Sequence, residues 1–257
     1  MFIHFWLVKS LIGKLKSNVL GQLEKEMSKQ EIIAMVLEQD NDAVSAKIST
    51  ISEEDLPEGD VTVRIDYSTL NYKDAMILKG IGKLVRKFPH VPGVDFSGVV
   101  EKSSSAKFSE GDRVVLNGWR VGEAHWGGYS QKARVNSRWL VHVPDNFTNA
   151  HAMGIGTAGY TAMLAISALE KNGLSVENEG EVLVTGAAGG VGSIAVAILS
   201  SLGYRVTAST GRKEAGEYLI DLGATAIISR KELEEEISSP LSSQRWSGVI
   251  DNVGGVI

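Results

Sequence analysis

Short runs of alternating apolar and polar residues fill the first half of the chain. The alternation is clearest at Val61-Thr62-Val63-Arg64-Ile65, where every second side chain is apolar, as in a strand with one buried face. Six further β-rich runs, separated by turn residues, fall at 32–37, 46–51, 94–101, 113–116, 128–135 and 140–143. This regular spacing predicts a small barrel-like β domain, with a short helix over 71–79.

Beyond Pro144 strands and helices alternate. The predicted helices cover 150–168, 191–202, 214–222 and 232–237, and the predicted strands cover 181–185, 205–209, 226–229 and 248–251. Such alternation is typical of a parallel sheet with helices on its faces. We therefore predict an α/β chain, in which a β-rich domain (28–146) precedes a doubly wound parallel sheet (147–257) that stops after its fourth strand.

The first 27 residues differ from the rest. Their apolar side chains recur at helical spacing, and the segment carries four lysines and two glutamates, a composition compatible with a basic helix lying on a membrane surface. We favour the plainer interpretation of an N-terminal extension (1–27) that the fold does not need. No apolar run reaches the ~18 residues of a membrane-spanning helix, and no signal peptide is expected.

Composition removes several classes of chemistry. The 257 residues include no cysteine, which excludes disulfides, thiolate nucleophiles and cysteine-bound zinc and suits a cytoplasmic protein. The five histidines show no metal-binding spacing, so no metal site is predicted. A formal net charge of −5 provides no basic footprint for nucleic acid.

A glycine-rich loop joins the 181–185 strand to the helix that follows. A dinucleotide pyrophosphate needs a tight first turn, a residue without a side chain for close approach, and helix N–H groups directed at the charge. The loop matches GxGxxG with Ala187 in place of the first glycine. Its predicted cofactor contacts are Ala187, Ala188, Gly189, Gly190, Val191 and Gly192. The alternative is a glycine turn that serves only helix–strand packing.

The end of the second strand indicates which dinucleotide binds. NAD-binding units usually carry an acid there for the ribose hydroxyls, but this chain has Ser209, Thr210, Gly211 and Arg212. The Arg212 guanidinium can bind a 2′-phosphate through two hydrogen bonds. NADP(H) is therefore expected rather than NAD(H), the alternative being that Arg212 belongs to a solvated helix start.

Several motifs together resemble one protein family. They are Asn71-Tyr72-Lys73-Asp74, Gly93-Val94-Asp95-Phe96-Ser97-Gly98, Gly118-Trp119-Arg120-Val121-Gly122-Glu123, Gly156-Thr157-Ala158-Gly159 and Asp251-Asn252-Val253-Gly254-Gly255. The chain is similar, from about 32 to 255, to the zinc-free branch of the medium-chain dehydrogenases/reductases that holds acrylyl-CoA reductases and quinone oxidoreductases. The resemblance implies a GroES-like catalytic domain before the Rossmann sheet. Zinc alcohol dehydrogenases of this fold have a histidine where Val94 stands.

The same resemblance implies roles for four residues. Tyr72 would lie on the nicotinamide side of the site, either donating a proton or only packing against the cofactor. Asn71 would orient Tyr72 or a substrate carbonyl. Thr157 would contact the nicotinamide region, unless it only caps a helix, and Asn252 would complete the cofactor site.

The reaction that the resemblance implies is NADPH-dependent reduction of an activated C=C bond. Hydride adds to the β-carbon of an enoyl thioester such as acrylyl-CoA, the carbonyl takes the charge and a proton returns at the α-carbon. The alternatives are an NADPH:quinone oxidoreductase and an inactive remnant that at most binds NADPH.

Two further features bear on substrate and assembly. Lys79, Lys83, Arg86 and Lys87 could attract a coenzyme A phosphate, although a solvated loop is the favoured interpretation, and Trp119 and Trp126 line either a substrate slot or the core. Family members continue with two more strands and dimerise through that part. The chain is thus expected to be C-terminally truncated, with an exposed fourth strand and no secure homodimer.

Overall fold

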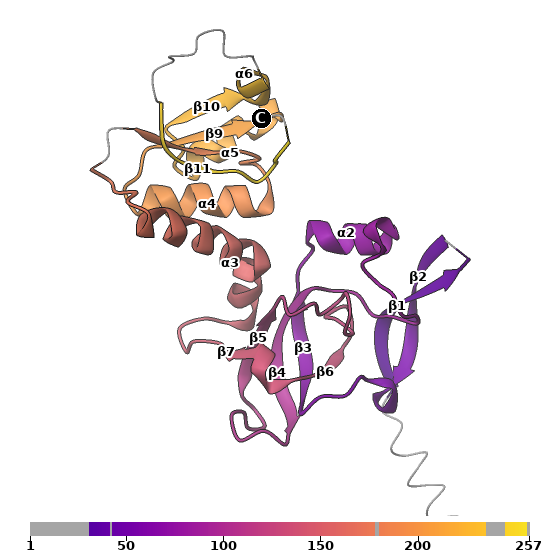
Figure 1. Ribbon diagram of the computed structural model, residues 1–257. Helices are drawn as coiled ribbons and strands as arrows, with labels where there is room; N and C mark the ends of the chain where they lie inside the picture. Colours follow the sequence, from indigo (N-terminus) through magenta and orange to yellow (C-terminus); the bar gives the residue numbers. More distant parts are fainter. Residues whose placement is uncertain (1–30, 42, 178–179, 235–244, 256–257) are drawn as a thin grey trace, which may run out of the picture. The chain divides into compact units, whose positions relative to one another are not determined.

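A computed structural model describes residues 31–41, 43–177, 180–234 and 245–255. They fall into two compact units that divide after Asn149, drawn in Figure 1 from indigo to yellow. The N-terminal extension predicted over 1–27 lies outside the described residues.

The first unit contains two antiparallel sheets. A hairpin of β1 (Glu31–Asp40) and β2 (Ala43–Ser52) forms one, and five strands in the order β6-β3-β4-β5-β7 form the other. These five are β3 (Val61–Ser68), β4 (Asp95–Ser103), β5 (Arg113–Asn117), β6 (Lys132–Val135) and β7 (Leu140–His142). Helix α2 (Tyr72–Leu78) and the 3-10 turns Glu53–Asp55, Ile81–Lys83 and Ser137–Trp139 connect them.

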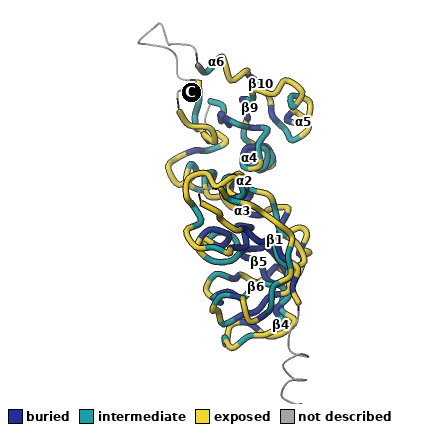
Figure 2. Tube along the Cα trace, turned by 90° about the vertical axis from the view of Figure 1, so that its right-hand side faces the viewer, coloured by how far each residue is buried: buried dark blue, intermediate teal, exposed yellow. Residues whose placement is uncertain are grey.

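Alternation along the strands builds the core of this unit. On β5 the side chains of Val114 and Leu116 are fully buried, while those between and beside them are only half-buried. They pack with Val63, Phe96 and Val100 from the neighbouring strands. In Figure 2 buried residues of this unit appear as dark blue stretches of the tube. The expected β-rich domain is therefore confirmed.

One predicted strand is shorter than expected. The sequence suggested a strand over 128–135, but β6 covers only Lys132–Val135. The N–H groups of Gly127, Gly128 and Tyr129 donate instead to the carbonyls of the 91–93 turn, at 2.7–2.9 Å. These bonds to a neighbouring loop bend the segment away from the ladder.

The second unit is a four-stranded parallel sheet in the order β10-β9-β8-β11. Its strands are β8 (Glu181–Val184), β9 (Val206–Thr210), β10 (Ala226–Ser229) and β11 (Trp246–Ile250). Its helices are α3 (Asn149–Lys171), α4 (Gly190–Ser201), the 3-10 turn Lys213–Ala215, α5 (Gly216–Asp221) and α6 (Arg230–Glu234). Within the described residues β11 is an edge strand, as expected.

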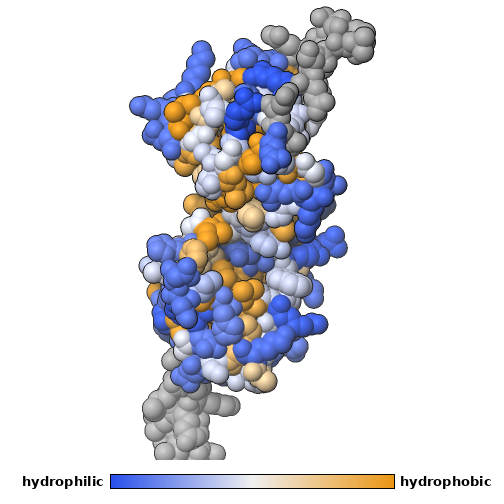
Figure 3. Space-filling model, turned by 90° about the vertical axis from the view of Figure 1, so that its left-hand side faces the viewer, coloured by the Kyte–Doolittle hydropathy of each residue, from blue (hydrophilic) through white to orange (hydrophobic). Residues whose placement is uncertain are grey.

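Helix α3 carries the main departure from ideal geometry in this unit. Its backbone breaks at Gly156, with φ 51° and ψ −162°, values that essentially only glycine adopts. Gly154 and Gly159 of the same helix have helical backbone angles. Several apolar side chains of α3, including Tyr160 and Leu164, remain exposed, and orange atoms among the blue ones in Figure 3 show that apolar side chains reach the surface.

By length and composition alone, α3 could also cross a membrane. This observation is weak, because core helices of soluble proteins pass the same criterion.

Two predicted helices differ in detail. The 214–222 helix is divided into the 3-10 turn and the short α5, and the 232–237 helix begins earlier, at Arg230. The carboxylate of Glu232 accepts the N–H of Ser229 at 2.7 Å, which fixes this earlier start. The remainder of that helix lies outside the described residues.

Candidate functional site

The glycine loop connects β8 to α4 by a tight turn against β9. The N–H of Ala187, which is fully buried, donates to the carbonyl of Ser209 at 3.0 Å. A Cβ on Gly192 would lie 2.4 Å from the carbonyl oxygen of Gly186, so only glycine permits this approach. Helix α4 thus begins directly behind the turn, with its first N–H groups lacking helical acceptors.

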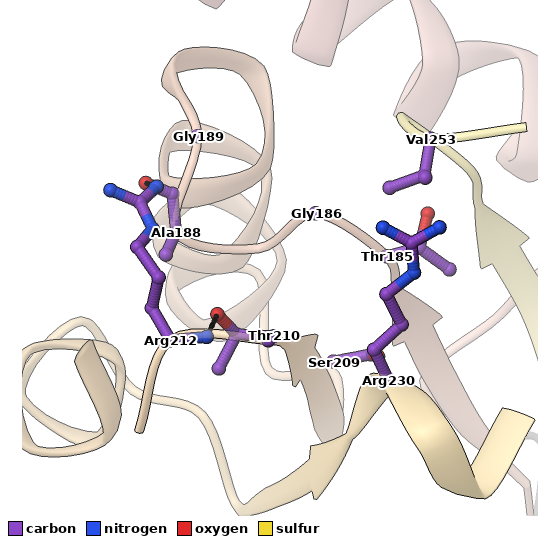
Figure 4. A pocket seen from close by; sticks show the side chains of 10 residues that line it. Thr185, Gly186, Ala188, Gly189, Ser209, Thr210, Arg212, Arg230 and Val253 are labelled. Carbon is purple, nitrogen blue, oxygen red and sulfur yellow. Dashed lines mark hydrogen bonds between the residues drawn. The ribbon is translucent and has the colours of Figure 1, made fainter. Parts of the chain in front are cut away.

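A pocket opens at this end of the sheet, and Figure 4 shows it from close by. It has a volume of about 260 Å³. The predicted contacts that line it are Ala188, Gly189, Ser209, Thr210, Gly211 and Arg212. Of the other predicted contacts, Ala187 forms the turn, and Gly190, Val191 and Gly192 form the first turn of α4.

Arg212 extends over the glycine loop. Its guanidinium donates to the carbonyl of Ala188 at 2.7 Å, and its backbone N–H donates to the Thr210 hydroxyl at 3.1 Å. The neighbouring cation Lys213 is exposed and does not line the pocket. The structure therefore distinguishes Arg212, which lines the pocket, from Lys213, which does not, a distinction that the sequence alone does not provide.

The sequence did not identify Arg230, which also lines the pocket. In Figure 4 its side chain lies beside Thr185, away from Arg212. Arg230 directly follows β10, which pairs with β9. Because the carboxyl ends of neighbouring parallel strands meet at one edge of the sheet, the residue after the third strand was the signal for it.

The ends of β8 and β11 are joined by side chains. The Asp251 carboxylate accepts the hydroxyl of Thr185 at 2.5 Å and two backbone N–H groups of the following turn. These hydrogen bonds, that of Thr185 first, lower the pKa of Asp251. Asn252 donates its backbone N–H to the Thr185 hydroxyl and its side-chain amide to the Thr185 carbonyl, both at 2.9 Å. Asn252 therefore braces the edge of the pocket.

Thr157 lies within α3, directly after the break at Gly156, and is half-buried. The next residue, Ala158, approaches the start of α4, because a Cβ on Gly190 would lie 3.4 Å from the Ala158 methyl. The second unit thus brings the loop, the end of β9 and this turn of α3 near one another.

The two remaining predicted residues, Asn71 and Tyr72, belong to the first unit. Tyr72 opens α2 with its side chain 84% exposed. Asn71 precedes it, and its amide donates to the Thr69 hydroxyl at 2.8 Å and to Asp95 at 3.1 Å. Asn71 is therefore fixed by buried partners.

Two buried carboxyl groups lie beneath Asn71. Asp74 is 1% exposed and accepts the N–H groups of Asn71 and Val94 at 2.9 and 3.1 Å. Burial raises the pKa of Asp74 in spite of these bonds. Burial, followed by the charge of Asp74, also raises the pKa of Tyr129. The group holds the start of α2 in place.

A salt bridge joins two of the sequence motifs. Lys73 of α2 lies 2.9 Å from the carboxylate of Glu123, which is 8% exposed. In the intervening loop Trp119 and Arg120 have φ of 56° and 59°, a conformation that costs roughly 1–3 kcal/mol per non-glycine residue. Trp119 is exposed, whereas Trp126 donates to the Pro89 carbonyl and packs on the core.

The buried His90 and the half-buried His125 have structural partners. His125 contacts the Arg134 carbonyl at 2.8 Å and stacks edge-on against Trp139, and His90 contacts the Gly122 carbonyl at 2.8 Å. Burial lowers the pKa of both. Among the described residues no group of three or more histidine, aspartate or glutamate side chains could hold a metal ion.

Comparison with known proteins places these features in a family. Residues 57–145 match the alcohol dehydrogenase GroES-like domain. An acrylyl-CoA reductase, AcuI, of Ruegeria pomeroyi is 54% identical over 226 residues, covering 87% of this chain and 68% of the relative. The chain belongs to the zinc-free medium-chain dehydrogenases/reductases of the acrylyl-CoA reductase branch.

Solved structures of this medium-chain branch agree with the fold. The yhdH oxidoreductase of Salmonella enterica, in complex with NADP, superposes with a TM-score of 0.83 at 49% identity, over 87% of this chain and 68% of that one. The Bacillus subtilis protein yhfP, with NAD bound, gives 0.84 at 45% identity, over 88% and 68%. The latter carries a provisional description as a quinone oxidoreductase.

Proposed function

We propose that the chain is an NADPH-dependent reductase of activated C=C bonds, with acrylyl-CoA or a similar 2-enoyl thioester as substrate. The observation that carries the cofactor assignment is the pocket at the ends of β9 and β10. It contains Arg212 and Arg230, and no carboxylate among its lining residues. Arginine guanidinium groups suit a 2′-phosphate, whereas an acid would suit the free ribose hydroxyls.

The residues present fit a dinucleotide. Gly192 permits the close turn, the N–H groups at the start of α4 suit a pyrophosphate, and the pocket between Arg212 and Arg230 suits the phosphorylated ribose. When bound, NADPH supplies the hydride. One guanidinium nitrogen of Arg212 donates to the Ala188 carbonyl, and the other N–H groups of the side chain can donate charged hydrogen bonds to a phosphate.

The first unit supplies the residues for the proton and the carbonyl. The exposed phenol of Tyr72 can donate a hydrogen bond or a proton to a bound substrate. Asn71 is a positioning residue for Tyr72, because its side-chain amide already donates hydrogen bonds to Thr69 and Asp95. Asp74 holds the N–H of Asn71 and so fixes the turn that presents Tyr72.

A quinone reductase is the second candidate, supported by the description of the Bacillus subtilis relative. The two candidates share the cofactor but differ in the acceptor. A thioester carries a large anionic coenzyme, and a quinone does not.

The test begins with calorimetric titration of NADPH and NADH into the purified 257-residue chain. We expect at least tenfold tighter binding of NADPH. Arg212→Ala should remove most of this preference, because charged hydrogen bonds contribute about 1.5–3 kcal/mol. Lys213→Ala, the matched control outside the pocket, should retain it. Equal binding of both dinucleotides by the unaltered chain would contradict the assignment.

Turnover is then measured as NADPH oxidation with acryloyl-CoA and, separately, with a benzoquinone. Faster turnover of the thioester supports the proposed reaction. Faster turnover of the quinone supports the second candidate, and tight NADPH binding without either reaction indicates a remnant that only binds the cofactor.

A further inference from the structure

A groove in the first unit shares no lining residue with the dinucleotide pocket and includes neither Asn71 nor Tyr72. It runs between the β1–β2 hairpin, the C-terminal end of α2 and the segment 80–88, and has a volume of about 740 Å³. That size is typical of sites for small organic ligands. We call it the cationic groove; its polar rim includes Lys83 and Arg86.

The positive charge of this rim is not compensated. The segment between α2 and β4 carries four cations, Lys79, Lys83, Arg86 and Lys87. Within the described residues none of them has a carboxylate within 4.0 Å. Other lysines of the unit do pair, as Lys47 does with Glu38 at 2.7 Å. The groove therefore attracts an anion without first having to break an ion pair.

The floor of the groove is apolar. Its side chains are Val44, Ile77, Leu84, Val85 and Phe88, which pack on the buried cluster of Leu37 and Val94. An apolar floor with an aromatic ring and a cationic rim suits an occupant that joins a flat ring system to phosphate groups. An adenine nucleotide has this combination.

One of the cations stands at a left-handed position of the backbone. Lys83 has φ 47°, a left-handed conformation that is uncommon for a residue with a side chain. A second hollow beyond Gln39 and Phe88 is bordered by Glu38 and Asp40. This acidic side would repel phosphates, so the anionic part of an occupant belongs beside Lys83 and Arg86.

The groove is also close enough to Tyr72 to serve the same substrate. Tyr72 opens α2, and Ile77, near its end, lines the groove. Seven residues of helix span roughly 10 Å. The pantetheine arm of coenzyme A is longer than this, so a nucleotide held in the groove leaves its thioester free to reach Tyr72.

We propose that the cationic groove binds the 3′-phosphorylated ADP end of the coenzyme A thioester. The proposal rests on the proposed function, since it concerns the same substrate. It assigns Lys83 and Arg86 to the phosphates and the apolar floor around Phe88 to the adenine. A quinone would make no use of the groove.

Coenzyme A is titrated calorimetrically into the chain with NADP⁺ in excess, so that the dinucleotide pocket does not take the coenzyme. Saturable binding is expected, weakening as salt is raised. The double variant Lys83→Gln, Arg86→Gln should weaken it at least tenfold. The control Lys107→Gln, Lys171→Gln changes the net charge equally at exposed sites outside the groove and should bind normally. The affinity for NADP⁺ should be unchanged in both.

A truncated substrate separates the groove from the reacting centre. The groove variant should raise KM for acryloyl-CoA at least tenfold and leave that for acryloyl-pantetheine unaltered. Absence of coenzyme A binding by the unaltered chain, equal binding by the two double variants, or displacement of coenzyme A by NADP⁺ would each overturn the groove assignment. The coenzyme A titration requires no turnover and therefore tests the groove by itself. Failure of the proposed reductase function would instead be detected as absence of NADPH binding or of NADPH oxidation.

Discussion

At the scale of single residues, the carboxylate of Asp74 joins two turns of the first unit by hydrogen bonds. Its carboxyl group is enclosed, and it accepts one N–H from the turn before α2 and one from the turn before β4. Both turns carry residues of the candidate site or its surroundings. The cost is an ionised group with little access to water.

The pH dependence of stability reports this cost. The pKa of Asp74 is raised from its ordinary 3.8, so the folded state holds the proton more tightly than the unfolded one. The stabilisation is complete below pH 3.8 and is lost as pH rises through the folded-state pKa. Asp74→Asn does not titrate. We expect its free energy of unfolding, relative to the unaltered chain, to improve as pH rises above 4 and to level off once pH exceeds the folded-state pKa of Asp74, as followed by urea titrations.

A matched control for this titration is Asp145→Asn, whose side chain is fully exposed. Because this variant removes no buried carboxylate, it should not reproduce the change expected for Asp74→Asn. A constant difference for Asp74→Asn would contradict the role of burial.

Gly192 tests the close approach in the glycine loop. A methyl group there would meet backbone atoms of 186 and 187 at 2.4–2.9 Å, and backbone cannot yield as a side-chain tip can. Gly192→Ala should destabilise the chain by about 1–3 kcal/mol and weaken NADPH binding at least tenfold. Gly154→Ala has no atom within 4 Å and should instead stabilise α3 by about 0.5–1 kcal/mol.

At the scale of elements, the Lys73–Glu123 salt bridge ties α2 to the 118–127 loop. Lys73 is half exposed but Glu123 is nearly buried, and Arg120 approaches the same carboxylate at 3.8 Å. The tie supports a loop that contains two left-handed residues. We infer that it keeps this strained loop in one conformation.

Removal of one charge tests the tie. Glu123→Gln should lower stability by about 1 kcal/mol, the upper end for partly exposed pairs, and accelerate proteolytic cleavage within 118–127. Glu38→Gln breaks an exposed pair with Lys47 of similar geometry and should change neither. Stability is measured by urea unfolding, and the cleavage sites are identified by mass analysis of the peptides. If both substitutions had equal effects, the burial of Glu123 would not contribute to the stability of the loop.

Helices and strands with a regular pattern of apolar and polar residues were predictable from the sequence. The exact residues at which these elements begin and end were not. The four parallel strands and β3 followed from their patterns, since one or both faces are buried. The 128–131 segment was predicted to continue the strand at 132–135. Gly128 and Tyr129 instead donate to the 91–93 turn, and Ser130 and Gln131 pair with β1, and both sets of partners are distant in sequence. Arg230 escaped notice for a related reason: it joins Arg212 only once β10 pairs with β9. The burial of Asp74 in the first turn of α2 depends on packing that the local sequence does not reveal.

At the scale of the whole chain, acid acts on the two units at different pH. His90 and His125 lie in the first unit with pKa values lowered from 6.5 by burial. Their stabilisation is present above pH 6.5 and is lost as pH falls through the lower folded-state pKa values. In the second unit the pKa of Asp251 is lowered from 3.8, so its loss begins only at stronger acid.

Limited proteolysis can separate these responses. The raised pKa of Asp74 stabilises the first unit as pH falls, whereas the histidines destabilise it. The experiment therefore uses the Asp74→Asn variant, in which only the histidine effect remains. As pH falls from 6.5 to 5.5 we expect thermolysin to cleave the first unit progressively faster, relative to an unfolded reference peptide, with little change in the second or between pH 7.5 and 6.5. Adding His125→Gln should flatten the response of the first unit. Parallel acceleration of both units would contradict the assignment to the histidines.

The break in α3 has a consequence for inheritance. Gly156 adopts φ 51° and ψ −162°, and every single-base change of a glycine codon that is not synonymous yields a stop or a residue with a Cβ. Selection on this codon therefore acts through the shape of the backbone, whatever substrate a lineage acquires. In a library randomised at this codon and sorted for folded chains, we expect glycine to be recovered almost alone, while Gly154 two codons earlier drifts freely.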